Sequence, residues 1–394
     1  ISIELPNSIT QILEKAFWGC EKLQNVYYNG DKEEKAAIAI SENNDNLINA
    51  EWTYGEEVPE VVPDTVLQDG VRYQLVNRKT YEITGYDENC LASINIPETL
   101  NNCSVTAVQN GAFKNCSQLT SITIPDSVVK IEADAFNGCS NLTNIALSSN
   151  LESIGERTFN GCTNLKSISL PIKIVQISEQ TFEMCEKLES IVLPEGLKRI
   201  DNNAFANCSN LREINLGSNV KQIGSYAFYK CNSLKTMIFP SSLEDLGEYA
   251  LAECSGLESV SFSAGLSELK ACTFSKCSAL QHVKLPSDLL IIGEASFYDC
   301  TNLQNIDIPD AVQRIESKAF KECSNLSEIH LPSLLERIEA EEFSGCVALE
   351  NIQLPEHLES IEIEAFDRCT GLTKIKIPDG VTYLDSHVFL GCSN

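Results

Sequence analysis

The sequence predicts a β-rich solenoid in which coils of 23 residues stack on one another. Its first sign is a row of thirteen cysteines at a constant interval of 23 residues, from Cys116 to Cys392. The second is a leucine three residues after the cysteine in all twelve intervals, from Leu119 to Leu372. The third is a phenylalanine three residues before the next cysteine in eleven of the twelve intervals. A period held this long is typical of stacked repeats rather than of one closed globule.

Each coil is expected to contain two extended segments and a compact corner. Apolar residues six and eight positions after the cysteine, such as Ile122 and Ile124, have the alternation of a strand with one buried face. Proline follows in nine of the twelve coils and ends that strand. A second extended segment carries Val128 and Ile131, and the corner carries Phe136 before the next cysteine. Because like residues recur, they should stack along the axis at about 4.8 Å.

The recurring pattern L-x-x-I-x-L-P, then L-x-x-I, then A-F-x-x-C resembles the BspA-like leucine-rich repeat. That family occurs in surface proteins of host-associated bacteria and some protozoa. The resemblance covers most of the chain and implies a leucine-rich repeat solenoid, a curved right-handed coil with short parallel strands on its concave face. It also implies a cell-surface or secreted location, a role in adhesion or protein binding, and no catalytic residue.

Breaks in the period divide the chain. Residues 1–54 are expected to be the C-terminal end and cap of an upstream repeat array. Residues 55–65, which are acidic and contain two prolines, should form a semi-stiff linker. Residues 66–90 should form a β-hairpin cap, and residues 91–394 one irregular rung followed by twelve regular repeats. Because the array stops at Asn394 without a capping segment, we expect the natural protein to be longer than this chain.

The cysteines are expected to serve packing rather than chemistry. The periodic ones lie beside the buried phenylalanine, and thirteen equivalent thiols cannot pair evenly, so buried free thiols are favoured over disulfides between neighbouring coils. Cys90 and Cys103 flank the irregular rung, where a disulfide and two free thiols are both open. Cys272 should be exposed. No cysteine or histidine cluster has zinc-ligand spacing, so neither a metal nor another cofactor is expected.

Charge and motifs narrow the function classes. The formal net charge is −27, with 56 acidic against 29 basic residues, which argues against nucleic-acid binding. It either keeps a long surface soluble or attracts basic partners or Ca²⁺ weakly. No run of 18 apolar residues predicts membrane insertion. Catalytic motifs are missing, and carboxylates such as Glu339, Glu341 and Glu342 are expected at outward, solvated positions, so the sequence does not predict an enzyme.

The outward side chains of the first strand are the expected protein-binding surface. They stand five and seven residues after each cysteine, and they change from small or hydroxylated in early coils to charged or imidazole in later ones. The candidate residues are Val192, Asn215, Ile238, His282, Lys284, Asp307, His330, Gln353, Lys374 and Lys376. Unselected drift at outward positions is the alternative explanation of this variety.

The expected partner is a protein ligand such as a host matrix or surface protein, and the sequence does not indicate an oligomeric state. His282 and His330 are two rungs apart, about 10 Å, which is too far for one metal ion. The competing function is a passive spacer that holds other domains away from the cell surface.

Overall fold

The computed structural model describes residues 1–55, 62–263 and 265–394. The chain divides into two compact units, Ile1–Asp64 and Thr65–Asn394. Residues 56–61, which make up the middle of the expected 55–65 linker, lie outside the described residues.

The first unit is built on short parallel strands. β3 (Asn25–Tyr28) lies between β1 (Ser2–Leu5) and β5 (Glu51–Tyr54) in one sheet. β2 (Gln11–Ile12) and β4 (Ala39–Ile40) form a second parallel pair. The two pairings repeat the alternation of a longer and a shorter strand that most coils of the second unit show.

Two short helices, α1 (Lys32–Ala36) and α2 (Asp45–Ile48), complete the first unit. Asp31 caps α1: its side chain accepts hydrogen bonds from the backbone N–H groups of Glu33 and Glu34, and Glu34 accepts one from the N–H of Asp31. The buried core of this unit consists of Leu5, Ile12, Val26, Tyr28, Ile38 and Leu47.

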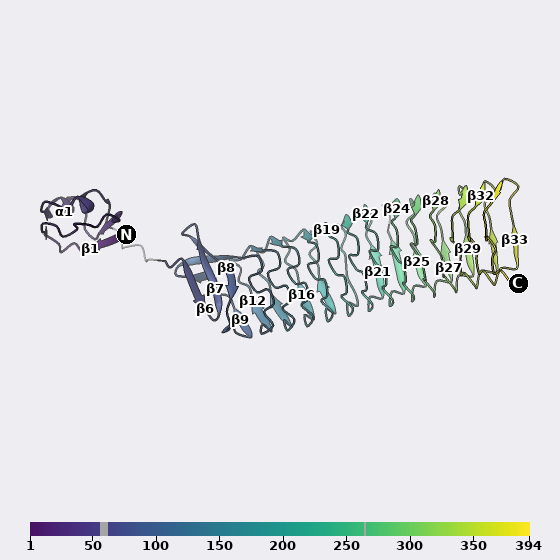
Figure 1. Ribbon diagram of the computed structural model, residues 1–394, viewed down its shortest axis with the longest axis horizontal. Coiled ribbons are helices and arrows are strands. Elements are labelled where there is room, and N and C mark those ends of the chain that lie inside the picture. The colour runs from purple at the N-terminus through teal and green to yellow at the C-terminus, as the bar shows by residue number, and fades with distance from the viewer. Residues whose placement is uncertain (56–61, 264) are drawn as a thin grey trace. The chain divides into compact units, whose positions relative to one another are not determined.

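An antiparallel sheet begins the second unit (Figure 1). β6 (Thr65–Gln68), β7 (Val71–Val76) and β8 (Thr80–Tyr86) pair antiparallel in that order. β8 then pairs in parallel with β11 (Cys103–Val108), which also takes β10 (Thr99–Leu100) as an antiparallel neighbour. The sequence did not indicate β6, because its four residues follow directly on the acidic, proline-containing segment.

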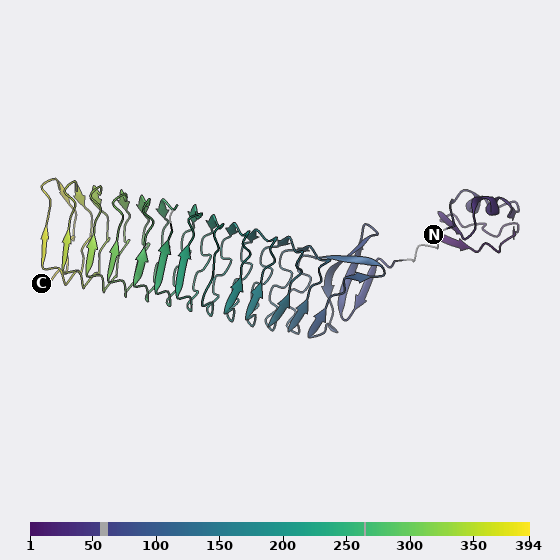
Figure 2. The same ribbon diagram turned by 180° about the vertical axis from the view of Figure 1, so that it is seen from behind.

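The rest of the second unit is a β-solenoid, and this fold class confirms the sequence prediction. Figures 1 and 2 show the coils stacked in one long row, and most coils have a longer first strand and a shorter second strand. The first strands are β9 (Ser93–Asn95), β12 (Ser121–Thr123), β14 (Asn144–Ala146), β16 (Ser167–Ser169), β18 (Ser190–Val192), β21 (Thr236–Phe239), β23 (Ser259–Phe262), β25 (His282–Lys284), β27 (Asn305–Asp307), β29 (Glu328–His330), β31 (Asn351–Gln353) and β33 (Lys374–Lys376).

The second strands have two residues each and also pair in parallel. They are β13 (Lys130–Ile131), β15 (Ser153–Ile154), β17 (Gln176–Ile177), β19 (Arg199–Ile200), β20 (Gln222–Ile223), β22 (Asp245–Leu246), β24 (Glu268–Leu269), β26 (Ile291–Ile292), β28 (Arg314–Ile315), β30 (Arg337–Ile338), β32 (Ser360–Ile361) and β34 (Tyr383–Leu384). Neighbours pair with a shift of 23 residues, as when Ile131 pairs with Ile154.

The corner, defined as the segment from five residues before each cysteine to the cysteine, adds a third ladder. The backbone N–H groups of Asp134, Phe136 and Gly138 donate to carbonyls of the next coil at 2.8 to 2.9 Å. To alternate in this way, the chain takes a positive φ at the first corner residue, 56° at Asp134, and again just before each cysteine. Most of these residues are not glycine, and this feature was not expected from the sequence.

Like side chains form continuous columns inside the coils, as the sequence predicted. The rings of Phe113, Phe136 and Phe159 stack with centroids 5.2 and 5.6 Å apart. The ring column continues to Phe389 and is interrupted at Leu251. The periodic thiols lie beside it: those from Cys116 to Cys369 are buried and Cys392 is half-buried.

Candidate functional site on the first-strand face

Strand alternation presents one set of side chains outward, which we call the first-strand face. In β18, Ile191 is buried between the exposed Ser190 and Val192. The inward residue packs in the core, so the residues on either side of it must point away from the coil. All ten candidate residues from the sequence are exposed and lie on this face.

The structure separates these candidates into three groups along the array. Val192, Asn215 and Ile238 line one hollow. His282 and Lys284 lie together on β25. The remaining five lie on the sheet β27-β29-β31-β33, where Asp307, His330, Gln353 and Lys376 follow one another in register and Lys374 lies beside Lys376.

The first-strand sheet is interrupted at the coil between β18 and β21. Residues 213–215 belong to no strand, whereas β16 pairs with β18 on one side and β21 pairs with β23 on the other. The local sequence explains the break. Gly217 replaces the usual proline, has a φ of 69° and donates its N–H to Oδ1 of Asn215 at 3.0 Å, which turns the chain away from a strand.

A hollow of about 910 Å³ lies at this break, against about 270 Å³ for the hollow that Gln353, Lys374 and Lys376 line. Ile214, the inward residue of the irregular coil, is only half-buried. Val192 and Ile238, which are 62% and 67% exposed, lie on either side. The hollow therefore offers an aliphatic surface, bordered by the hydroxyl groups of Ser190, Ser218, Thr236, Ser241 and Ser263, and its only charged lining residue is Glu213.

The β25–β33 part of the face carries charges of both signs. Lys284 and His282 lie at one end, Lys374 and Lys376 at the other. Asp307 and Glu328 lie between them, together with His330 and neutral amides. Cations at both ends of a mixed row distinguish this surface from the rest of a chain with a net charge of −27.

Ion pairing differs between the first-strand face and the rest of the array. Away from that face, Lys130 pairs with Glu132 and Lys221 with Glu244, both at 2.7 Å. Within the part of the chain that the structure describes, Lys284 and Lys374 have no ion-pair partner, and Lys376 reaches only the highly exposed Glu356 at 3.7 Å. These three ammonium groups are therefore available to an external partner.

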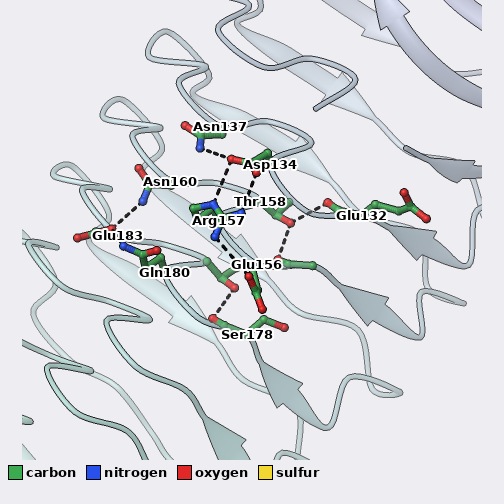
Figure 3. A network of polar contacts seen from close by, with 12 residues as sticks. Glu132, Asp134, Asn137, Glu156, Arg157, Thr158, Asn160, Ser178, Gln180 and Glu183 are labelled. Carbon is green, nitrogen blue, oxygen red and sulfur yellow. Dashed lines mark hydrogen bonds and ion pairs between the residues drawn. The ribbon is translucent and has the colours of Figure 1, made fainter. Parts of the chain in front are cut away.

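A polar network occupies the corners of three successive coils (Figure 3). Asp134 accepts hydrogen bonds from Arg157 and Asn137 at 2.6 to 3.3 Å. It also accepts one from Lys114 at 3.2 Å. Burial alone would raise the pKa of Asp134, but these bonds outweigh it and lower the pKa to about 2. Thr158 donates to the carbonyl of Gly155 at 2.7 Å, a bond within one corner. The network ties neighbouring coils together and leaves few polar groups free to bind a ligand.

The acidic residues at 339–342 correct a sequence prediction. Glu342 is fully buried, and Glu339 and Glu341 are half-buried, rather than solvated. One carboxylate oxygen of Glu342 accepts from the N–H of Glu339 at 2.9 Å, and the other has no hydrogen-bond partner. Burial raises the pKa of Glu342 well above its usual value. The sequence contained one sign of this burial: Glu342 directly precedes Phe343, and at that position other coils have alanine, serine, threonine or valine.

Two cysteine expectations also change. Cys272 is half-buried beside Tyr249, not exposed, and burial raises its pKa. Cys90 does not face Cys103: its Sγ lies 3.8 Å from the Sγ of Cys116. Cys103 begins β11, opposite Leu100. Among the described residues, no group of three or more histidine, cysteine or acidic side chains is arranged to hold a metal ion.

The 23-residue coil, its columns and its corner also characterise a known family. A family model described as the BspA type leucine rich repeat region matches this chain in six copies, over residues 1–49, 85–212, 175–304 and 290–394. The chain belongs to this family. A comparison of this BspA-type chain with curated proteins finds no match.

Solved structures resemble the BspA-type chain as well. A leucine rich cell surface protein from Faecalibacterium prausnitzii A2-165 has 25% identity and a TM-score of 0.56, over 84% of this chain and 93% of that one. A leucine-rich repeat protein from Bacteroides ovatus ATCC 8483 has 26% identity and a TM-score of 0.42, over 81% and 99%. The pneumococcal vaccine antigen PcpA has 20% identity and a TM-score of 0.48, over 84% and 95%.

Membrane insertion was tested on the described helices. α1 has five residues and α2 has four, and neither they nor any other helix in the described ranges could cross a bilayer.

Proposed function

We propose that this BspA-type chain is a non-enzymatic, cell-surface or secreted scaffold that binds a protein ligand through its first-strand face. The expected ligand is a host matrix or surface protein. Similarity to a leucine rich cell surface protein supports the location. The observation that carries the binding role is the set of unpaired cations on this face of a strongly acidic chain.

The ion-pair pattern gives the physical argument. Most lysines elsewhere on the array already neutralise a carboxylate, as Lys235 does with Glu258 at 2.7 Å. Lys284 and Lys374 have no such partner among the described residues, so an acidic ligand group can approach them without first displacing an internal one. Charge complementarity of this kind mainly raises the association rate and selects the partner.

The hollow beside Val192 and Ile238 supplies a different kind of contact. Its aliphatic surface can bury an apolar side chain of the ligand, which contributes affinity in proportion to the area removed from water. In this proposal, the lysines on the β25–β33 part of the first-strand face select the ligand, and the hollow adds an apolar contact.

A passive spacer is the second candidate function. The backbone ladder of the corner favours it, because hydrogen bonds connect each coil to the next and stacked rings reinforce all but the coils around Leu251. A spacer would need no ligand on the first-strand face, so the two functions differ in a measurable way.

The deciding experiment measures binding of the whole chain to immobilised fibronectin, laminin and collagen. A variant with Lys284, His330, Lys374 and Lys376 changed to alanine should bind roughly tenfold more weakly, mostly through a slower association rate. The matched control changes four exposed lysines on the other side of the coils, Lys130, Lys173, Lys198 and Lys221, and should bind like the parent. Equal loss in both variants would indicate non-specific attraction, and absence of binding by the parent would favour the spacer.

A further inference from the structure

The column of buried thiols has a regular hydrogen-bonding pattern. Each periodic cysteine from Cys139 to Cys392 donates its S–H to the backbone carbonyl of the residue 26 positions earlier, at 3.0 to 3.3 Å. That residue is the phenylalanine of the preceding coil, or Leu251 in one case. A thiol engaged in this way is a protonated donor aimed at oxygen.

Cys116 ends this column and differs from all the others. The residue 26 positions before it is Cys90, and the atom that Cys116 approaches is the Cys90 Sγ, at 3.8 Å, rather than a carbonyl oxygen. Both thiols are buried, with 1% exposure at Cys116 and 5% at Cys90. Among the described residues, no other two thiols form a hydrogen bond with each other.

The backbone around Cys90 is held in place. Its N–H donates to the carbonyl of Asp87 at 3.0 Å. Gly70 packs so closely that a Cβ there would lie 2.3 Å from the Cys90 nitrogen, so only glycine fits. Forming a disulfide bond of about 2.05 Å from this 3.8 Å contact requires the two sulfurs to approach each other by about 1.8 Å.

We propose that Cys90 and Cys116 are a cross-linking pair, which a low-molecular-weight disulfide oxidises to a protein disulfide. One protein thiolate attacks the oxidant, forms a mixed disulfide and releases one small thiolate. The second protein thiolate then attacks the protein sulfur of the mixed disulfide and releases the second small thiolate. The protein loses two protons and two electrons, and the oxidant gains the two electrons.

The product joins the antiparallel sheet β6-β7-β8 to the first regular coil of the solenoid. Cys90 lies four residues after the end of β8. Cys116 ends the corner next to the one that Cys139 ends. The disulfide would lie at the end of the column of thiol–carbonyl hydrogen bonds, where Cys116 has the Cys90 thiol rather than a carbonyl as its partner. Because burial raises the pKa of Cys90 to about 12, the exchange proceeds when this end of the array opens or as the chain folds.

Peptide mapping tests the proposal on the full chain. The protein is reduced, unfolded, and refolded with either reduced or oxidised glutathione, after which free thiols are alkylated in denaturant, so that buried thiols react, and trypsin is added. Residues 80–114 contain Cys90 and Cys103 in one tryptic peptide, and residues 115–130 contain Cys116 in the next. Oxidative refolding should link these two peptides and lower the alkylated 115–130 peptide roughly tenfold relative to reductive refolding.

Three variants separate the cross-link from its alternatives. Cys103→Ser should keep the linked species, and Cys139→Ser, a matched loss of one column thiol, should keep it too. Cys90→Ser should abolish it. Full alkylation of the 115–130 peptide after oxidative refolding would overturn the proposal, as would a link that persists in Cys90→Ser or disappears in Cys103→Ser.

Discussion

The corner and the first-strand face run along the same coils but differ in how strictly they repeat. The corner carries its ring stack, its thiol bonds and its backbone ladder through nearly every coil, with Leu251 as the single change in the ring column. The first-strand face loses its strand at residues 213–215 and varies from serine to lysine along its length. Stacking therefore depends on the corner, and the first-strand face can change without loss of the solenoid.

The largest expected effect is at the corner. Phe205 is fully buried, with its ring centroid 5.3 Å from those of Phe182 and Phe228. Phe205→Ala should lower the free energy of unfolding by about 3–5 kcal/mol, because a cavity opens between two coils. Urea unfolding followed by circular dichroism measures the change. The control Val192→Ala removes an exposed side chain of the same coil, and equal losses in the two variants would contradict the comparison.

An increase in stability of intermediate size is expected on replacing Glu342, because other coils have a small residue at this place in the corner. Glu342→Thr should raise the free energy of unfolding at pH 7 by about 1–3 kcal/mol, because it removes a buried carboxyl group that has an unpartnered oxygen. Other coils have threonine at this place, as at Thr158, Thr181 and Thr273. Chemical unfolding of parent and variant at pH 7 measures the difference.

The pH dependence identifies the cause of this gain. The folded protein holds Glu342 protonated, since burial raises its pKa, whereas the unfolded chain releases the proton above its ordinary pKa. The parent should therefore lose stability as the pH rises from about 4 to 7 relative to Glu342→Gln. A difference between these two proteins that does not change with pH would contradict a titrating Glu342.

The smallest expected effect is on the first-strand face. Ile238→Ser should change the free energy of unfolding by less than about 0.5 kcal/mol, because Ile238 is 67% exposed. Phe239→Ser on the same strand should cost several times more, because Phe239 is fully buried. Parallel urea titrations compare the two, and binding to the proposed matrix ligands should fall in Ile238→Ser despite its unchanged stability. A large stability loss at Ile238 would mean that this face also serves packing.

Periodicity determined how much of this molecule could be predicted. Strand alternation, the Phe136-type ring column and buried thiols such as Cys139 follow from residues that recur every 23 positions. The break at residues 213–215 had a local signal in Gly217, but one replaced proline does not reveal a hollow. Positive φ values at residues such as Asp134 leave almost no signal, since neighbouring coils impose them through hydrogen bonds.

Contacts that depend on the irregular rung were harder to predict. The irregular rung does not repeat the spacing of the later coils, and in it Cys90 lies against Cys116 rather than Cys103. Glu342 was misplaced for a different reason. Its charge favours solvent, and only the comparison with small residues at the same place in other coils indicates burial. For the candidate site, the sequence predicted outward orientation correctly but could not predict which cations lack an ion-pair partner.

The thiol column also allows the opening of each coil to be measured by alkylation. Each coil from Cys139 to Cys369 contains a buried sulfur that an alkylating reagent can reach only while that coil is open. Burial raises the pKa of these thiols, to about 12 at Cys254 and Cys323, so a closed coil reacts very slowly. Timed alkylation followed by peptide mapping thus yields an opening rate for each of these coils without any mutation. Comparing the rates shows at which end of the stack the coils open first.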